Sequence, residues 1–264
     1  MPVNSSLSER RKQMLNKVPE VTLAFWVIKI LSTTVGETGA DYLSVHLGLG
    51  RAITAGIMAI LLLVFLAAQL RDSRYTPWKY WVSVVLISVV GTQMTDALTD
   101  GMNVSLYAST VAFAIALAAV FAIWYWIERT LSIHTIVTRQ RELFYWAAIL
   151  FTFALGTAAG DLATEALGLG FKIGILVFGT LIALIAAAYA LGANAVLAFW
   201  LAYILTRPLG ACLGDFLSQS RTYGGLGFGT QATSIAFLLV IAGFVSYLTF
   251  NPGRATSSNK QLRP

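Results

Sequence analysis

The chain has 264 residues, of which 57% are hydrophobic and only 11% charged, and its mean hydropathy is +0.73. Soluble globular domains carry about 25% charged residues, so this composition excludes a soluble protein and indicates a membrane protein. The single cysteine excludes a disulfide framework and a thiolate metal cluster. The net charge of +6 does not require a nucleic-acid partner, because the basic residues are sorted between particular loops.

Eight apolar stretches of about twenty residues are expected to be membrane-spanning helices. They follow a polar, basic segment at residues 1–19, which is not a cleavable signal peptide because the next apolar stretch is too long and carries charges. In chain order the stretches lie at about 21–45, 51–70, 78–100, 106–127, 143–166, 172–192, 195–219 and 230–249. The predicted fold is an all-α integral membrane protein with one transmembrane domain at residues 20–250 and a cytoplasmic tail at 251–264.

One pattern occurs four times, in the odd-numbered stretches: an aromatic residue, a Trp, nine residues, a Gly, four residues and an Asp. This repetition predicts four two-helix repeats, at about residues 20–75, 76–135, 140–193 and 194–250. The first and third Trp are 120 residues apart and the second and fourth 119, which indicates two duplicated halves. The motif triplets are Trp26, Gly36, Asp41; Trp81, Gly91, Asp96; Trp146, Gly156, Asp161; and Trp200, Gly210, Asp215.

Basic residues gather at the two termini and in alternate loops, thirteen against three on the opposite side. Cytoplasmic loops carry the excess of Lys and Arg, so both termini are expected to be cytoplasmic and the four odd helices parallel. We expect the protein in a bacterial inner (plasma) membrane. The thirteen are Arg10, Arg11, Lys12, Lys17, Arg71, Arg74, Lys79, Arg129, Arg139, Arg141, Arg254, Lys260 and Arg263; the three are Arg51, Lys172 and Arg221.

Each odd helix carries one polar face, because residues four apart lie on the same side of a helix. The even stretches carry no such face, so the odd helices are expected inside and the even helices around them. A small residue four positions after each motif Gly favours close packing, and the motif Trp are expected to anchor the membrane interface. The polar faces are Lys29, Thr33, Glu37, Asp41; Ser88, Thr92, Asp96, Asp100; Thr157, Asp161, Glu165; and Tyr203, Arg207, Ala211, Asp215, Gln219.

These faces hold seven acids but only two bases, Lys29 and Arg207. Ionisable groups inside membrane spans are costly and usually mark a pathway or a site. Internal pairing leaves five acids, which must be protonated, hydrated or neutralised by a bound cation. We therefore expect a cation or proton site, with purely structural polar packing as the alternative.

Carboxylates with Thr and Gln oxygens and no cluster of His or Cys form an oxygen site, which suits Ca²⁺, Mg²⁺ and Mn²⁺. Lys29 and Arg207 are expected to stand in for the cation when none is bound. His46 is expected to be a loop residue and Cys212 a packing residue. The expected metal ligands are Glu37, Asp41, Asp96, Asp161 and Asp215, supported by Thr33, Thr92, Thr157 and Gln219 and, nearer the surface, by Asp100 and Glu165.

Nearly the full chain resembles a group of bacterial multi-spanning proteins described only as uncharacterised membrane-anchored proteins. The resemblance rests on Val18 to Thr22, on Phe25-Trp26 through Lys29, and on Thr33 to Asp41. A weaker likeness is to the Golgi-type calcium/manganese–proton exchangers, whose repeats carry E-x-G-D followed by a basic residue and Ser or Thr. Here Glu37 to Asp41 has one residue more and no basic residue after it. That likeness is an analogy of chemistry and does not support shared ancestry.

No nucleotide-binding loop, catalytic triad or zinc-protease motif is present, so neither an enzyme nor an ATP-driven pump is expected. The predicted function is secondary transport of a divalent metal cation, Mn²⁺ first, coupled to protons. Its partners would be the lipid bilayer, the metal ion and protons, with no tightly bound cofactor and no nucleic acid. The alternative is a non-transporting membrane sensor or scaffold with an acidic ligand-binding mouth.

Overall fold

The structure is a computed structural model that describes residues 16–46 and 48–250. Within these residues every regular element is helical, as predicted. The eight predicted stretches are confirmed as helices with ends close to the expected ones, whereas most of the basic segment 1–19 and the whole tail 251–264 lie outside the described residues. The long helices are α2 (Leu23–Asp41), α3 (Arg51–Arg71), α4 (Pro77–Asp96), α5 (Leu106–Glu128), α6 (Arg139–Asp161), α7 (Gly170–Ala190), α8 (Ala195–Ser218) and α9 (Thr230–Phe250).

Seven of these helices are long and apolar enough to cross a membrane, which makes the chain a multi-pass membrane protein. The helix outside this set is α2, which carries three charged residues, Lys29, Glu37 and Asp41. It nevertheless packs between α4 and α8, and its charged residues therefore lie inside the bundle.

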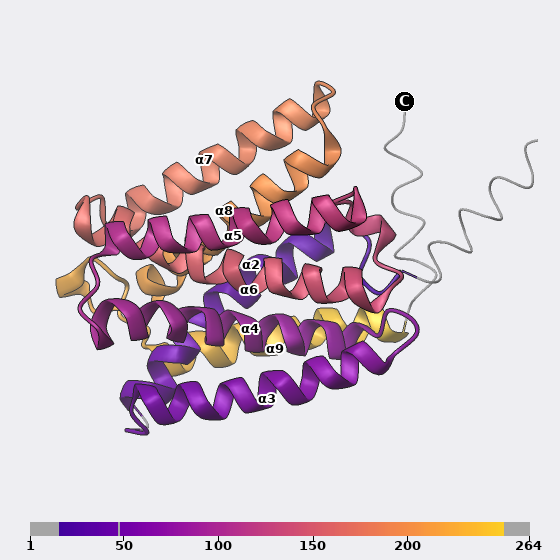
Figure 1. The fold of residues 1–264 in the computed structure, drawn as a ribbon. Helices are drawn as coiled ribbons and strands as arrows, with labels where there is room; N and C mark the ends of the chain where they lie inside the picture. Colours follow the sequence, from indigo (N-terminus) through magenta and orange to yellow (C-terminus); the bar gives the residue numbers. More distant parts are fainter. Residues whose placement is uncertain (1–15, 47, 251–264) are drawn as a thin grey trace, which may run out of the picture.

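The odd-numbered stretches of the sequence are helices α2, α4, α6 and α8, called the odd helices here, and the even-numbered stretches are α3, α5, α7 and α9, called the even helices. The odd helices form a closed ring, in which α2 and α6 each pack against both α4 and α8. The even helices, α3, α5, α7 and α9, surround this ring, with α3 and α7 on opposite sides of the bundle (Figure 1). The even helices are mostly exposed; α3 buries only Thr54, Leu62 and Gln69. The prediction of odd helices inside and even helices outside is confirmed.

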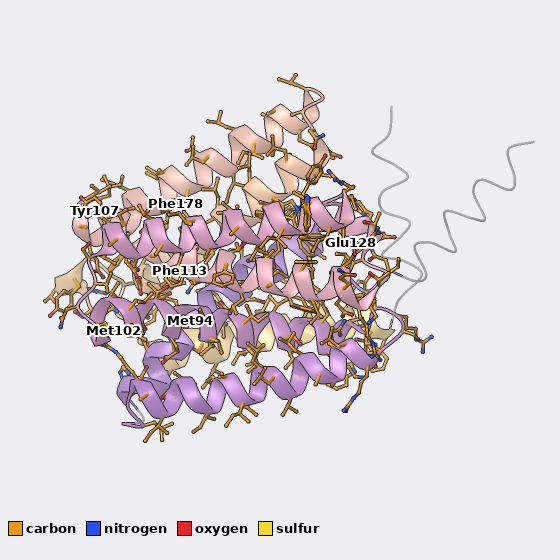
Figure 2. The ribbon with its side chains drawn as sticks, viewed as in Figure 1. Met94, Met102, Tyr107, Phe113, Glu128 and Phe178 are labelled. Carbon is orange, nitrogen blue, oxygen red and sulfur yellow. The ribbon has the colours of Figure 1, made fainter. Side chains whose placement is uncertain are left out.

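Each even helix packs mainly on the odd helix of the next repeat. Thus α3 packs on α4, α5 on α6 and α7 on α8, and α9 closes the circle by packing on α2. A small second core shows this arrangement. In it, Phe113 of α5 lies against Ala154 and Ala158 of α6, with Met94 of α4 beside them (Figure 2). The four repeats are therefore interlocked around the ring.

The two ends of the ring differ in chemistry. Glu128 marks the end that carries the motif Trp, here called the tryptophan end, and Met102 and Tyr107 mark the opposite, aspartate end (Figure 2). At the aspartate end three of the odd helices continue into a π-helical turn directly after the motif Asp. Such turns are rare and often found at functional sites. The turns are Tyr42–His46, Ala97–Gly101 and Leu162–Ala166.

At the tryptophan end the first aromatic residue of each motif contacts the Trp of the following repeat. Three of the four motif Trp are buried in this layer, so the predicted interfacial anchoring is wrong for them. The indoles fill the space between the four helices, while Trp78 and Trp126 are exposed. The centroid distances are 5.6 Å for Phe25–Trp81, 5.4 Å for Tyr80–Trp146, 6.1 Å for Tyr145–Trp200 and 5.8 Å for Phe199–Trp26.

The motif Gly mark the closest approach between odd helices. A Cβ atom added to any of them would lie within 2.7 Å of the next odd helix, at the residue three positions before that helix's own Gly. Because every contact joins the Gly of one helix to the residue three positions before the Gly of the next, the helices run parallel and at one level. The contacts join Gly36 to Ser88, Gly91 to Phe153, Gly156 to Arg207 and Gly210 to Thr33.

Replacing a motif Gly should therefore destabilise the fold. In Gly91→Ala the new methyl would lie 2.7 Å from the Phe153 Cβ, and such overpacking costs about 1–3 kcal/mol. Gly56→Ala is the matched control, since a Cβ there meets nothing within 4 Å and Ala favours the helix. Thermal unfolding in detergent should show a lower midpoint for Gly91→Ala only. Equal midpoints would contradict the close approach.

Candidate functional site

Arg207 of α8 occupies the centre of the ring and touches all three other odd helices. Its guanidinium donates to the Glu37 carboxylate of α2 at 2.8 Å and to the Thr92 hydroxyl of α4. A third bond, at 3.4 Å, goes to the Thr33 carbonyl of α2. The guanidinium carbon lies 5.9 Å from the Phe153 ring centroid on α6, and the side chain is fully buried.

Two glycines of α6 make room for this arginine. A Cβ on Gly156 would lie 2.5 Å from the Arg207 Cβ, and one on Gly160 would lie 3.5 Å from the Pro208 Cα. Pro208 lies inside α8 and has no N–H to donate to the helix. The small-residue pattern on α6 is thus the surface that receives the charged part of α8.

Lys29 lies nearer the tryptophan end and makes no ion pair among the described residues. Its Nζ lies 4.0 Å from the Phe153 ring centroid and 4.2 Å from that of Tyr203, and it has no hydrogen-bond partner. Ring faces attract a cation but do not neutralise it. Of the two bases expected as internal counter-ions, Arg207 is paired with an acid and Lys29 is not.

The four motif aspartates lie one helical turn beyond the Arg207–Glu37 pair, at the aspartate end. Each side chain is partly exposed, and none of the four carboxylates forms a hydrogen bond or an ion pair with another described residue. The aspartate end therefore carries four carboxyl groups that have no partner among the described residues.

The two outer acids differ from each other. Asp100 forms a half-exposed ion pair with Arg51 at 2.8 Å, whereas Glu165 is exposed and unpaired within the described part of the chain. Among the described residues, no three His, Cys, Asp or Glu side chains are grouped so that they could hold one metal ion. The expected ligands Glu37, Asp41, Asp96, Asp161 and Asp215 therefore do not form a ready-made metal shell in this arrangement.

The predicted supporting threonines lie inside the ring with their hydroxyl hydrogens engaged. Thr92 donates to the Ser88 carbonyl and Thr157 to the Phe153 carbonyl, both at 3.1 Å, and Thr33 donates to the Ile30 carbonyl at 2.6 Å. A hydroxyl whose hydrogen is taken by its own helix offers only lone pairs to other groups. Gln219 lies apart from them, at the C-cap of α8.

The two single residues noted in the sequence have ordinary surroundings. Cys212 is buried and lies where a Cβ on Gly174 of α7 would reach its Sγ at 2.7 Å, in agreement with a packing role. His46 is exposed, stacks on Tyr42 and contacts the Thr230 hydroxyl at 3.3 Å.

A buried ion pair between Lys17 and Glu142 was not predicted from the sequence. Lys17 Nζ contacts the Glu142 carboxylate and the Leu70 carbonyl, the latter at 3.2 Å, and the Lys17 N–H donates to the Ile136 carbonyl at 3.1 Å. These contacts hold residues 16–18 beside the start of α6. The chain then continues to the start of α2, which is not a neighbour of α6 in the ring. The signal available in the sequence was Glu142, an acid in the first turn of a span.

A protein-family model matches the chain over all four repeats. The matched residues are 24–75, 79–130, 144–192 and 198–253, and the family is described as "Repeat of Unknown Function (DUF347)". The chain belongs to this family. The family boundaries agree with the four repeats predicted from the recurring motif. No curated protein and no solved structure matches the chain.

The stabilities contributed by Arg207 and Glu37 should depend on each other, because the two side chains form one buried ion pair. Removing one member of a buried ion pair leaves an uncompensated charge and costs about 3–5 kcal/mol. Arg207→Met and Glu37→Gln should each lower the unfolding midpoint in detergent. The double variant should lose less than the sum of the two single losses. Additive losses would mean that the two groups are not coupled.

Proposed function

We propose that this protein is a secondary transporter of a divalent metal cation, Mn²⁺ first, in exchange for protons. The observation that carries the proposal is the set of four motif aspartates, which are partly exposed, equivalent by repeat and without a partner in the described part of the chain. Carboxylates gathered at one end of the ring would raise the local concentration of cations there. The aspartates would form the entry site for the cation.

All eight helices cross the membrane in this proposal, including α2, whose charged residues lie within the ring. The tryptophan end faces the cytoplasm of a bacterial cell, and both termini are cytoplasmic. The basic residues in the loops that follow α3 and α5 support this orientation. The aspartate end then opens to the outside.

Arg207 is the barrier below the entry site. Its guanidinium donates to Glu37 and Thr92 and so occupies the place that a cation would take. A divalent cation arriving at the aspartates repels the guanidinium and competes for Glu37. Glu37 would then leave Arg207 and bind the cation. Separation of the aromatic side chains at the tryptophan end would open the ring towards the cytoplasmic side.

The available donors favour a hard cation. The ring offers carboxylates and threonine lone pairs, whereas the one cysteine of the chain packs against Gly174, and hard divalent cations prefer oxygen ligands. Because no three acids of the described residues are grouped so that they could hold one ion, cation binding would have to draw the aspartates together. Protons would take the place of the cation on these carboxylates after its release.

The test is Mn²⁺ flux in proteoliposomes with and without a pH gradient. Asp41→Asn, Asp96→Asn, Asp161→Asn and Asp215→Asn each remove one charge and keep the size of the side chain, so each should lower flux about tenfold or more, because divalent ions are selected by ligand charge. Asp72→Asn is the matched control, since Asp72 lies at the C-cap of α3 and pairs with Lys79 of α4, away from the motif aspartates. Asp100→Asn, at the rim, should alter mainly the apparent affinity.

Wild-type flux in the four Asn variants would show that the aspartates are structural polar groups. Saturable Mn²⁺ binding by the wild-type protein without any flux would contradict transport and favour a membrane sensor. Protein content of the liposomes serves as the reference for every variant.

A further inference from the structure

A groove of about 280 Å³ lies between the last turn of α3 and the first turns of α6, at the tryptophan end. Its apolar part is formed by Ala67, Leu70 and Leu143, and two arginines, Arg71 and Arg139, line it as well. Leu143 is 55% exposed, so the groove opens on the outside of the bundle, where lipid surrounds a membrane protein.

The two arginines of this groove are exposed, and neither side chain bonds to another described residue. Nearby acids do not compensate them, because each is engaged elsewhere. Glu142, in the same turn as Arg139, pairs with Lys17, and Asp72, next to Arg71, pairs with Lys79. The groove thus combines an apolar wall with two uncompensated positive charges.

The back of the groove is held rigidly. The Leu70 carbonyl accepts a hydrogen bond from Lys17 at 3.2 Å, and the Gln69 amide contacts Glu142 at 3.4 Å. Gln69 and Glu142 are fully buried. A ligand that binds in the groove therefore meets a preformed surface between two helices.

We propose that this groove binds the headgroup of an anionic phospholipid. The phosphate would lie between Arg71 and Arg139 at the level of the membrane interface, and an acyl chain would run along Ala67, Leu70 and Leu143. Basic pockets between helices at the cytoplasmic side of a membrane suit such headgroups. The inference does not depend on transport.

The geometry favours a lipid over a free phosphate because the charged and apolar parts are continuous. Arginine matches phosphate with paired N–H donors, but two exposed arginines alone would bind a free anion weakly. The apolar wall adds binding only for a ligand that carries a hydrocarbon chain.

Native mass spectrometry of the purified protein in detergent, titrated with phosphatidylglycerol or phosphatidylcholine, tests the proposal. The wild-type protein should retain phosphatidylglycerol in preference. Arg71→Gln and Arg139→Gln should each weaken this binding about fivefold, and together more, from the contribution of one basic residue near a lipid surface. Arg74→Gln and Arg129→Gln are the matched controls, because both residues are exposed and lie outside the groove.

Undiminished binding by the double groove variant, or an equal loss in the two controls, would overturn the proposal. Displacement of the lipid by millimolar inorganic phosphate or glycerol phosphate would show a free-phosphate site instead. All four arginines are exposed, so the unfolding midpoints of the variants should equal that of the wild-type protein. Inorganic phosphate should leave lipid binding unchanged.

Discussion

The close approach of successive odd helices at the four motif glycines sets the geometry of the whole ring. Any side chain there would separate the helices, because a Cβ would meet the neighbouring helix at 2.7 Å or less. Every contact joins the same two repeat positions, so all four helices lie at one level and their aspartates emerge at one end. In the fourth helix the residue at this contact is Arg207, and its side chain is thereby aimed into the centre.

The repeated frame and the charged centre follow different rules. Aromatic contacts, glycine contacts and the packing of even helices recur around the ring, which is what a fourfold internal repeat predicts. Lys29, Glu37 and Arg207 occur once each at their repeat positions, where the other copies have apolar residues, aromatic residues or small polar ones. The symmetric frame thus places an asymmetric set of ionisable groups at its centre.

The sequence predicted the helices, the four repeats and the inside position of the odd helices, because motif spacing and helical periodicity identify a face. They do not identify the helix that this face meets. The pairing of Glu37 with Arg207, the isolation of Lys29 and the packing of even helices on the next repeat therefore required the structure. The Lys17–Glu142 pair joins residues 125 positions apart, and no local pattern connects them. The common position of the aspartates predicted one depth, but could not predict how far apart they lie.

The central claim is that the four motif aspartates are accessible and accept a cation, while Glu37 is held by Arg207. Carbodiimide labelling of carboxyl groups in the purified protein, read by mass spectrometry with and without Mn²⁺, tests it directly. We expect labelling of Asp41, Asp96, Asp161 and Asp215 without metal and protection of all four by Mn²⁺, with exposed Glu165 still labelled. Labelling of the four aspartates that Mn²⁺ leaves unchanged would contradict a cation site at this end of the ring.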